Sequence, residues 1–252
     1  MRLAGARCLV VGGARRLGYQ IALGLAADGA AVCASSRGTD DAIVATAGAL
    51  RRAGAATAAA IRGDVREPRA AAALVAAGAE ALGGLDVLVF AASGPFVPQP
   101  PQDIDETAWD ASLDTIAKGF FFSACAAHDL FVARSAPGLA PGVIVAITDY
   151  LGLQPWAAFA AHGAAKAAQI HLVKELARAW ADDGVRVCGV APGPVDLEDD
   201  EHRAATLRAA AQTEAERLVT PAQVVAAVRL CVENEGMTGV NVVVDAGSLL
   251  AS

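Results

Sequence analysis

Short apolar runs alternate along the chain with longer, alanine-rich stretches that carry polar residues at helical spacing. The short runs are rich in β-branched residues, which favour strands, and the longer stretches have the length of amphipathic helices. Strands are expected at Cys8–Val11, Ala31–Ser35, Ala58–Arg62, Val87–Ala91, Val143–Thr148, Arg186–Val190 and Val240–Val244. The main helices are expected at Leu17–Asp28, Asp41–Ala53, Pro68–Leu82, Asp103–Lys118 and Ala157–Asp182, with another beginning near Pro221.

Regular alternation of strand and helix predicts βαβ units, in which right-handed crossovers join parallel strands. The run Leu85–Val89, which only Asp86 interrupts, is typical of a strand covered on both faces. We therefore expect one α/β domain over residues 1–252, a doubly wound Rossmann-type fold whose seven-stranded, mainly parallel sheet has helices on both faces. Ligands of such sheets bind beyond the carboxyl ends of the strands.

One segment, residues 194–218, interrupts this pattern. It follows a strand and holds five acidic residues before a polar helical stretch: Asp196, Glu198, Asp199, Asp200 and Glu201. A solvated surface helix would have the same composition. The position after a strand end favours a lid over the site instead.

The composition narrows the class of partner. The formal charge of −7 argues against nucleic-acid binding, which needs clustered Lys and Arg. The five cysteines are scattered without metal-binding spacing, so we expect no metal and a reducing, cytoplasmic location. No apolar stretch of about 18 residues is free of charge, Gly and Pro, so no membrane span is expected.

The first strand runs into a glycine-rich turn directly before the first helix. Glycine allows a tight turn whose backbone N–H groups approach a phosphate, and the helix dipole favours an anion at that end. This order of elements predicts a dinucleotide site formed by Gly12, Arg15, Arg16, Leu17 and Gly18. A plain strand-to-helix turn is the alternative interpretation.

The residues after the second and third strands indicate which dinucleotide binds. NAD-binding proteins place Asp or Glu after the second strand to hold the ribose 2′-hydroxyl. Here that strand ends in Ser36-Arg37, so no carboxylate in this stretch repels a 2′-phosphate and Arg37 can pair with one. The sequence therefore favours NADP(H), with Ser36 and Arg37 at the phosphate. Asp64 and Val65, after the third strand, are expected beside the adenine, although Asp64 could instead cap a helix.

Several ordered motifs resemble the short-chain dehydrogenase/reductase family over nearly the whole chain. The phosphate loop, with Arg16 in place of the middle glycine, is similar to that of the pteridine-reductase branch. Ala91-Ala92-Ser93-Gly94 stands where the family has an Asn-Asn-Ala-Gly turn, and Pro192-Gly193 matches its Pro-Gly turn. The resemblance implies an oxidoreductase that also uses Ala91, Pro192 and Gly193 to bind its cofactor, and that assembles as a homodimer or homotetramer.

The resemblance also marks the catalytic positions, where this chain departs from the family. The family uses a Ser, a Tyr and a Lys; the Lys bonds the nicotinamide ribose and the Tyr exchanges a proton with the substrate oxygen. Registration on Gly152, Pro155 and Lys166 retains the Lys but puts His162 at the Tyr position. Asp149 stands at the Ser position, as it does in pteridine reductases.

A second departure concerns the family's upstream Asn, whose position is held by Ile116. Ile116 cannot bind the water of a proton relay as an amide does. Imidazole titrates near neutral pH, so His162 is expected to donate the proton, with Asp149 as its orienter and Lys166 as the ribose clamp. The alternative is that these positions drifted after the chemistry was lost, leaving polar residues in a cleft.

Three functions are compatible with these residues. The first is an NADPH-dependent reductase of a small carbonyl or C=N ring substrate. The second is a non-redox dehydratase, cyclase or isomerase that uses Asp149 and His162 as an acid–base pair. The third is a non-catalytic nucleotide-binding homologue. The phosphate loop, Arg37 and Lys166 favour the first function, whereas the absent Tyr and Asn favour the other two.

Overall fold

The computed structural model describes residues 1–94, 96–134, 142–197 and 218–250. In this part of the chain one sheet has the strand order β3-β2-β1-β4-β5-β6-β7, and every strand pair is parallel. The strands are β1 (Arg7–Val11), β2 (Ala31–Ser36), β3 (Ala58–Arg62), β4 (Val87–Phe90), β5 (Val143–Ile147), β6 (Arg186–Pro192) and β7 (Asn241–Val244). The predicted doubly wound α/β fold is confirmed, and its sheet is parallel throughout.

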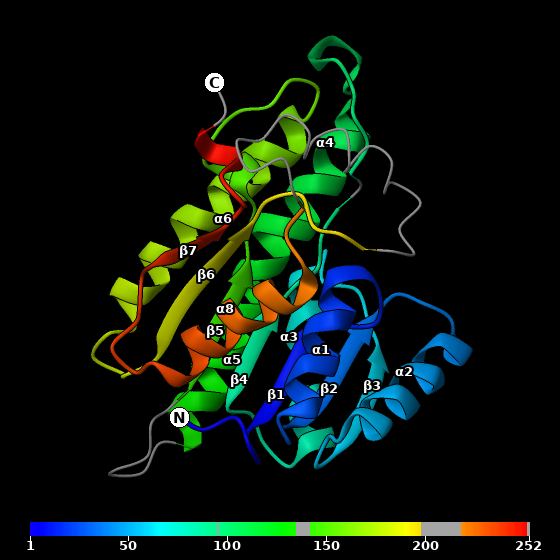
Figure 1. Cartoon of the computed structure of the whole chain (residues 1–252), viewed down its shortest axis with the longest axis vertical. Helices are drawn as coiled ribbons and strands as arrows, with labels where there is room; N and C mark the ends of the chain where they lie inside the picture. The colour runs from blue at the N-terminus through cyan, green and yellow to red at the C-terminus, as the bar shows by residue number, and fades with distance from the viewer. Residues whose placement is uncertain (95, 135–141, 198–217, 251–252) are drawn as a thin grey trace.

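Helices cover both faces of the sheet (Figure 1). They are α1 (Arg16–Ala27), α2 (Asp40–Ala53), α3 (Pro68–Leu82), α4 (Glu106–Leu113), α5 (Gly119–Arg134), α6 (Ala160–Ala179) and α8 (Pro221–Glu233). Short turns complete the set: η1 (Pro101–Asp103), the π-helical turn η2 (Asp114–Lys118), η3 (Tyr150–Gly152) and η4 (Ser248–Leu250).

Two predicted helices have wrong boundaries. The helix expected at 103–118 begins only after Asp105, whose carboxylate accepts the N–H of Ala108, and then continues through η2 into α5. The helix expected at 157–182 begins at Ala160, two residues after Ala158, whose φ of 68° lies outside the range of the interior of a right-handed helix. The first helix start is set by a capping side chain, and the second follows a residue with positive φ. The spacing of apolar residues reveals neither.

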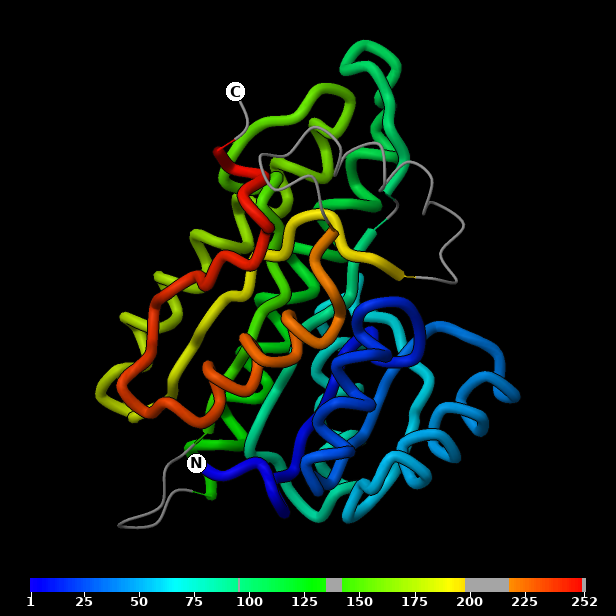
Figure 2. The backbone as a smooth tube through the Cα atoms, viewed as in Figure 1, coloured from blue at the N-terminus to red at the C-terminus, as the bar shows by residue number. Residues whose placement is uncertain are grey.

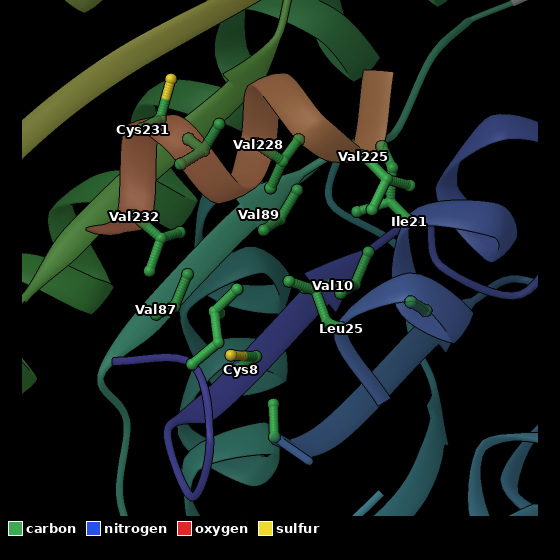
Figure 3. Close-up of a cluster of buried hydrophobic side chains, with 14 of the residues drawn as sticks. Cys8, Val10, Ile21, Leu25, Val87, Val89, Val225, Val228, Cys231 and Val232 are labelled. Atoms are coloured by element: carbon green, nitrogen blue, oxygen red, sulfur yellow. The ribbon is translucent and has the colours of Figure 1, made fainter. Parts of the chain in front are cut away.

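The core has two layers, because successive side chains of each buried strand point to opposite faces. On one face Cys8 and Val10 of β1 pack with α1 and α8, as Figure 3 shows for Leu25 and Val228. On the other face Leu9 and Val11 pack with α3, α5 and α6. Both layers are made of fully buried apolar side chains, so the sheet is a rigid platform for the turns at its ends.

The stretch Glu106–Arg134 has the length and hydropathy of a membrane span. Its α5 portion, however, buries Phe120, Ala124, Ala127 and Phe131 in the core layer that it shares with α3. Core helices of globular domains pass the same length and hydropathy test, so we interpret this stretch as a core helix.

Candidate active site

A cleft of about 870 Å³ lies beyond the carboxyl ends of the strands. The turns that follow β1, β4 and β5 all leave the sheet on this side (Figure 2). Every residue that the sequence marked for the cofactor or for catalysis lines the cleft: Gly12, Arg15, Arg16, Leu17, Gly18, Ser36, Arg37, Asp64, Val65, Ala91, Asp149, His162, Lys166, Pro192 and Gly193. The structure therefore brings together residues from six different strand ends.

The N-terminus of α1 faces the cleft without a side-chain cap. Its N-cap residue Arg15 makes no capping hydrogen bond, and the first turn holds no acidic residue. By contrast, Thr39 caps α2 and Thr220 caps α8. The first amides of α1 are thus available to an anion, as a pyrophosphate site requires.

Backbone geometry explains the glycines of this loop. Gly12 has a φ of +79°, and a Cβ there would lie 2.7 Å from the backbone nitrogen of Ala92. A Cβ on Gly18 would lie 2.2 Å from the carbonyl oxygen of Gly12. Arg16 is the exception, because it holds a φ of 51° with a full side chain. Such a conformation costs a non-glycine residue about 1 kcal/mol, so Arg16 lines the cleft at the expense of stability.

The tertiary structure changes the surroundings of Arg37. Its Nη1 lies 3.9 Å from the Asp64 carboxylate, which comes from the neighbouring strand end. Asp64 makes its shorter contact, 2.6 Å, with Arg66, and this arginine is the main cause of the lowered pKa of Asp64, with Arg37 a smaller one. Arg37 is half exposed and its ion pair is long, so the guanidinium can still reach a phosphate. Asp64 does not cap α3, whose N-cap is Glu67.

Lys166 is buried at the base of the cleft, with 4% of its surface exposed. Its Nζ donates to the carbonyl oxygen of Ile147 at 2.7 Å and to Gln169 Oε1 at 3.2 Å. Burial lowers the pKa of Lys166 to about 8, and the negative charge of Asp149 opposes that shift.

His162 and Asp149 form the polar pair that the sequence suggested. His162 Nε2 lies 3.2 Å from Asp149 Oδ2, and the other carboxylate oxygen accepts the N–H of Leu151 at 2.9 Å. The Asp149 carboxylate is thus placed to accept a hydrogen bond from an imidazole N–H at Nε2. His162 is 5% exposed, whereas the Asp149 side chain is 20% exposed. The pair can hold and release one proton at the edge of the cleft.

A chain of aromatic rings begins at His162 and extends along the cleft. Phe96 meets the His162 ring edge to face at 5.0 Å and stacks on Phe159 at 4.5 Å. Trp156 lies 5.7 Å from Phe159 and 6.1 Å from Tyr150. Phe96, Trp156 and Phe159 all line the cleft, and Phe159 is a residue that the sequence analysis missed. No spacing rule links Phe159 to Phe96, because they lie on different turns.

The π-helical turn η2 changes which residue of its segment faces the cleft. Ile116, at the family's Asn position, is fully buried in the core. Thr115 lines the cleft instead. A π turn shifts the register of a helix by one residue, and such turns are frequent at functional sites. The sequence placed the apolar Ile116 here, whereas in the structure Thr115 lines the cleft.

The predicted lid falls mostly outside the described residues. Of that segment, Val195 forms an isolated parallel bridge with Val219, and Leu197 lines the cleft. The lid therefore stays a prediction, although its start lies at the cleft.

Comparison with known proteins agrees with this geometry. A family model described as short chain dehydrogenase matches residues 6–207. The chain is 34% identical over 213 residues to 3beta-hydroxysteroid dehydrogenase 1 of Eggerthella lenta, covering 82% of this chain and 79% of that protein. It is 34% identical over 225 residues to cis-4-hydroxycyclohexanecarboxylate dehydrogenase of Sinomonas cyclohexanicum, covering 87% and 86%.

A solved structure shows the same fold. A short chain dehydrogenase from Burkholderia cenocepacia J2315, in complex with NADP, superposes with a TM-score of 0.85 at 30% identity over 99% of this chain and 100% of that one. The resemblance to the pteridine-reductase branch is not tested by these matches and stays a prediction. The motifs, the all-parallel sheet and these relatives together establish that the chain belongs to the short-chain dehydrogenase family of oxidoreductases.

Proposed function

We propose that this protein is an NADPH-dependent reductase of a carbonyl or C=N bond in a small, ring-bearing substrate. The observation that carries the proposal is one continuous cleft. Cationic residues suited to a phosphorylated dinucleotide line it together with a buried Lys and a His–Asp pair suited to proton transfer.

The residues at one end fit NADP(H). The open amides of α1 would hold the pyrophosphate, with Arg15 and Arg16 beside them. Arg37 would pair with the 2′-phosphate, which a guanidinium recognises better than a neutral hydroxyl. One matched relative was solved with NADP, which supports this choice. When bound, the cofactor supplies a hydride to the substrate.

The residues at the other end would handle the proton. His162, held by Asp149, would deliver a proton to the substrate oxygen or nitrogen as the hydride arrives. Lys166 lies one helical turn from His162 and would orient the nicotinamide ribose with the donor that its two protein contacts leave. Both roles use side chains already fixed by hydrogen bonds, as efficient proton transfer requires.

The surroundings of His162 support a ring-bearing substrate. The rings of Phe96, Phe159 and Trp156 offer apolar faces on which a flat or alicyclic ring can pack. Two matched relatives are named for a hydroxysteroid and a hydroxycyclohexanecarboxylate, both of which are alicyclic. A pterin ring fits the same chemistry and is retained as a test substrate.

The test is NADPH consumption by the purified protein with a cyclohexanone, a steroid ketone and an oxidised pterin. We expect turnover with at least one ring substrate and much weaker use of NADH. In parallel, calorimetry measures whether the protein binds NADP⁺. Binding of NADP⁺ without any hydride transfer would favour a non-redox acid–base enzyme and overturn the reductase proposal. Absence of binding at millimolar dinucleotide would overturn the cofactor as well.

A further inference from the structure

The ammonium group of Lys166 donates two hydrogen bonds within the protein. It donates to Ile147 O at the end of β5 and to Gln169 Oε1 on its own helix. An ammonium has three N–H donors, so one remains for a ligand in the cleft. The direction of that third donor is set by the other two, since the three are fixed in a tetrahedral arrangement.

Gln169 is an unusual residue for its place in the fold. It is fully buried, at a helix position where an apolar side chain would fill the space without a polar group. Its oxygen must face Lys166, because an ammonium only donates. Its Nε2 has no hydrogen-bond partner among the atoms that the structure describes. An amide that is buried with one end unsatisfied lowers the stability of the fold. A role for Gln169 must therefore be sought in its hydrogen bond to Lys166.

Burial works against the charge of Lys166. It lowers the lysine pKa to about 8, and Asp149 opposes the shift. The other titratable side chains nearby are His162, one turn earlier on α6, and Tyr150, after β5. Elements packed on α6 carry further charged groups that are occupied elsewhere or exposed. These are Glu106 and Asp110 on α4, Asp114 paired with Lys118 on η2, Arg186 of β6, bonded to carbonyls at the end of α8, and, on α5, His128 paired with Asp183, Arg134 paired with Asp86 and the exposed Asp129. Gln169 is thus the neutral side chain that directly solvates this cation.

We propose that Gln169 is a positioning residue, whose carbonyl oxygen keeps Lys166 protonated at neutral pH and aims its remaining donor into the cleft. The part of this inference that concerns the ribose rests on the proposed function. The Lys166–Gln169 coupling itself does not, because it is a property of the protein without cofactor.

The sequence allows a direct measurement. The chain has only three lysines, Lys118, Lys166 and Lys174, so protein labelled with ¹³C at lysine Cε gives three signals to follow against pH. In Gln169→Leu we expect the Lys166 signal to titrate about one pH unit lower than in wild type, a tenfold loss of proton affinity. In Gln169→Glu it should titrate at least one unit higher, because a carboxylate replaces a neutral acceptor.

Asn241→Leu is the matched control. Asn241 is also an amide whose oxygen accepts one hydrogen bond, from Thr148 at 2.7 Å, and whose nitrogen lacks a partner within the described chain. Its loss should lower stability by a similar amount and leave the Lys166 titration in place. If Gln169→Leu does not fold, Gln169→Met replaces it, since an unbranched side chain keeps the volume without the acceptor.

The second readout is the pH profile of NADP⁺ affinity by calorimetry. As pH rises, the NADP⁺ affinity of Gln169→Leu should begin to fall at a pH about one unit lower than in wild type. In Gln169→Glu the fall should begin at a higher pH than in wild type. Unchanged titration of Lys166 in Gln169→Leu would overturn the inference. Shifted titration with no dinucleotide binding to any variant would support the Lys166–Gln169 coupling and overturn the proposed function.

Discussion

One end of the cleft is lined by the open N-terminus of α1 and by three arginines, Arg15, Arg16 and Arg37; at the other end the ring of Phe96 packs edge to face on one buried histidine, His162. Backbone amides and long, partly exposed cations line the first end. Buried side chains in fixed contact line the second. Substitutions at the first end should therefore change affinity, whereas substitutions at the second should change the chemical step.

The largest expected effect tests whether the second end carries the chemistry. His162→Phe keeps a ring of similar size against Phe96 but removes the proton donor. We expect kcat to fall by about 10²- to 10⁴-fold, as is usual for loss of a general acid, with little change in NADP⁺ affinity. The control is His171→Phe, an exposed position on the same helix. Equal activity of the two variants would remove His162 from the mechanism.

The next effect concerns the buried cation between the two ends. Lys166 has a pKa of about 8 in the fold, below its ordinary 10.5, so between these pH values the unfolded chain holds the extra proton. The free energy of unfolding should gain up to about 3 kcal/mol from this group as pH rises through that window. Lys166→Met should lose this gain, measured as the difference between the two proteins in urea unfolding. If the free energies of unfolding of the two proteins change in parallel with pH, the fold does not lower the pKa of Lys166.

A smaller effect tests the choice of dinucleotide at the first end. Arg37→Ala should weaken NADPH binding by about 10- to 100-fold, the value of one charge-assisted hydrogen bond, and leave NADH binding almost unchanged. The control is Arg62→Ala, at the end of the neighbouring strand, where Arg62 pairs with Asp40. Comparable losses for NADPH and NADH would mean that Arg37 does not read the 2′-phosphate.

The smallest effect tests the strained arginine of the phosphate loop. Arg16→Gly relieves a φ of 51° but adds freedom to the unfolded chain, so we expect a net gain of only about 0 to 0.5 kcal/mol in urea unfolding. NADPH affinity should fall at the same time, because a guanidinium leaves the cleft. If Arg16→Gly is less stable than wild type and binds NADPH equally tightly, then Arg16 is neither strained nor used in cofactor binding.

Much of the fold and of the first end could be predicted from the sequence, because the signals are local. Strand Arg7–Val11, the glycine turn and helix Arg16–Ala27 follow one another directly, and each limits the backbone of the next. The predicted strands differ from the observed ones by at most two residues at an end. The candidate cofactor residues lie in one cleft for the same reason, since each follows a strand end and all parallel strand ends meet at one edge.

The second end depended on contacts between distant segments. The distance of 3.2 Å between His162 and Asp149, the stacking of Phe96 on Phe159, and the approach of Asp64 to Arg37 arise from helix packing and strand neighbours that no local pattern encodes. The π turn likewise exchanged Ile116 for Thr115 at the cleft. The amino-acid sequence by itself determined the family, the order of elements and the glycine-rich turn, because these depend on local backbone preferences. Tertiary packing alone decided which side chains meet at the second end, because a shift of one residue along a helix replaces one side chain by another.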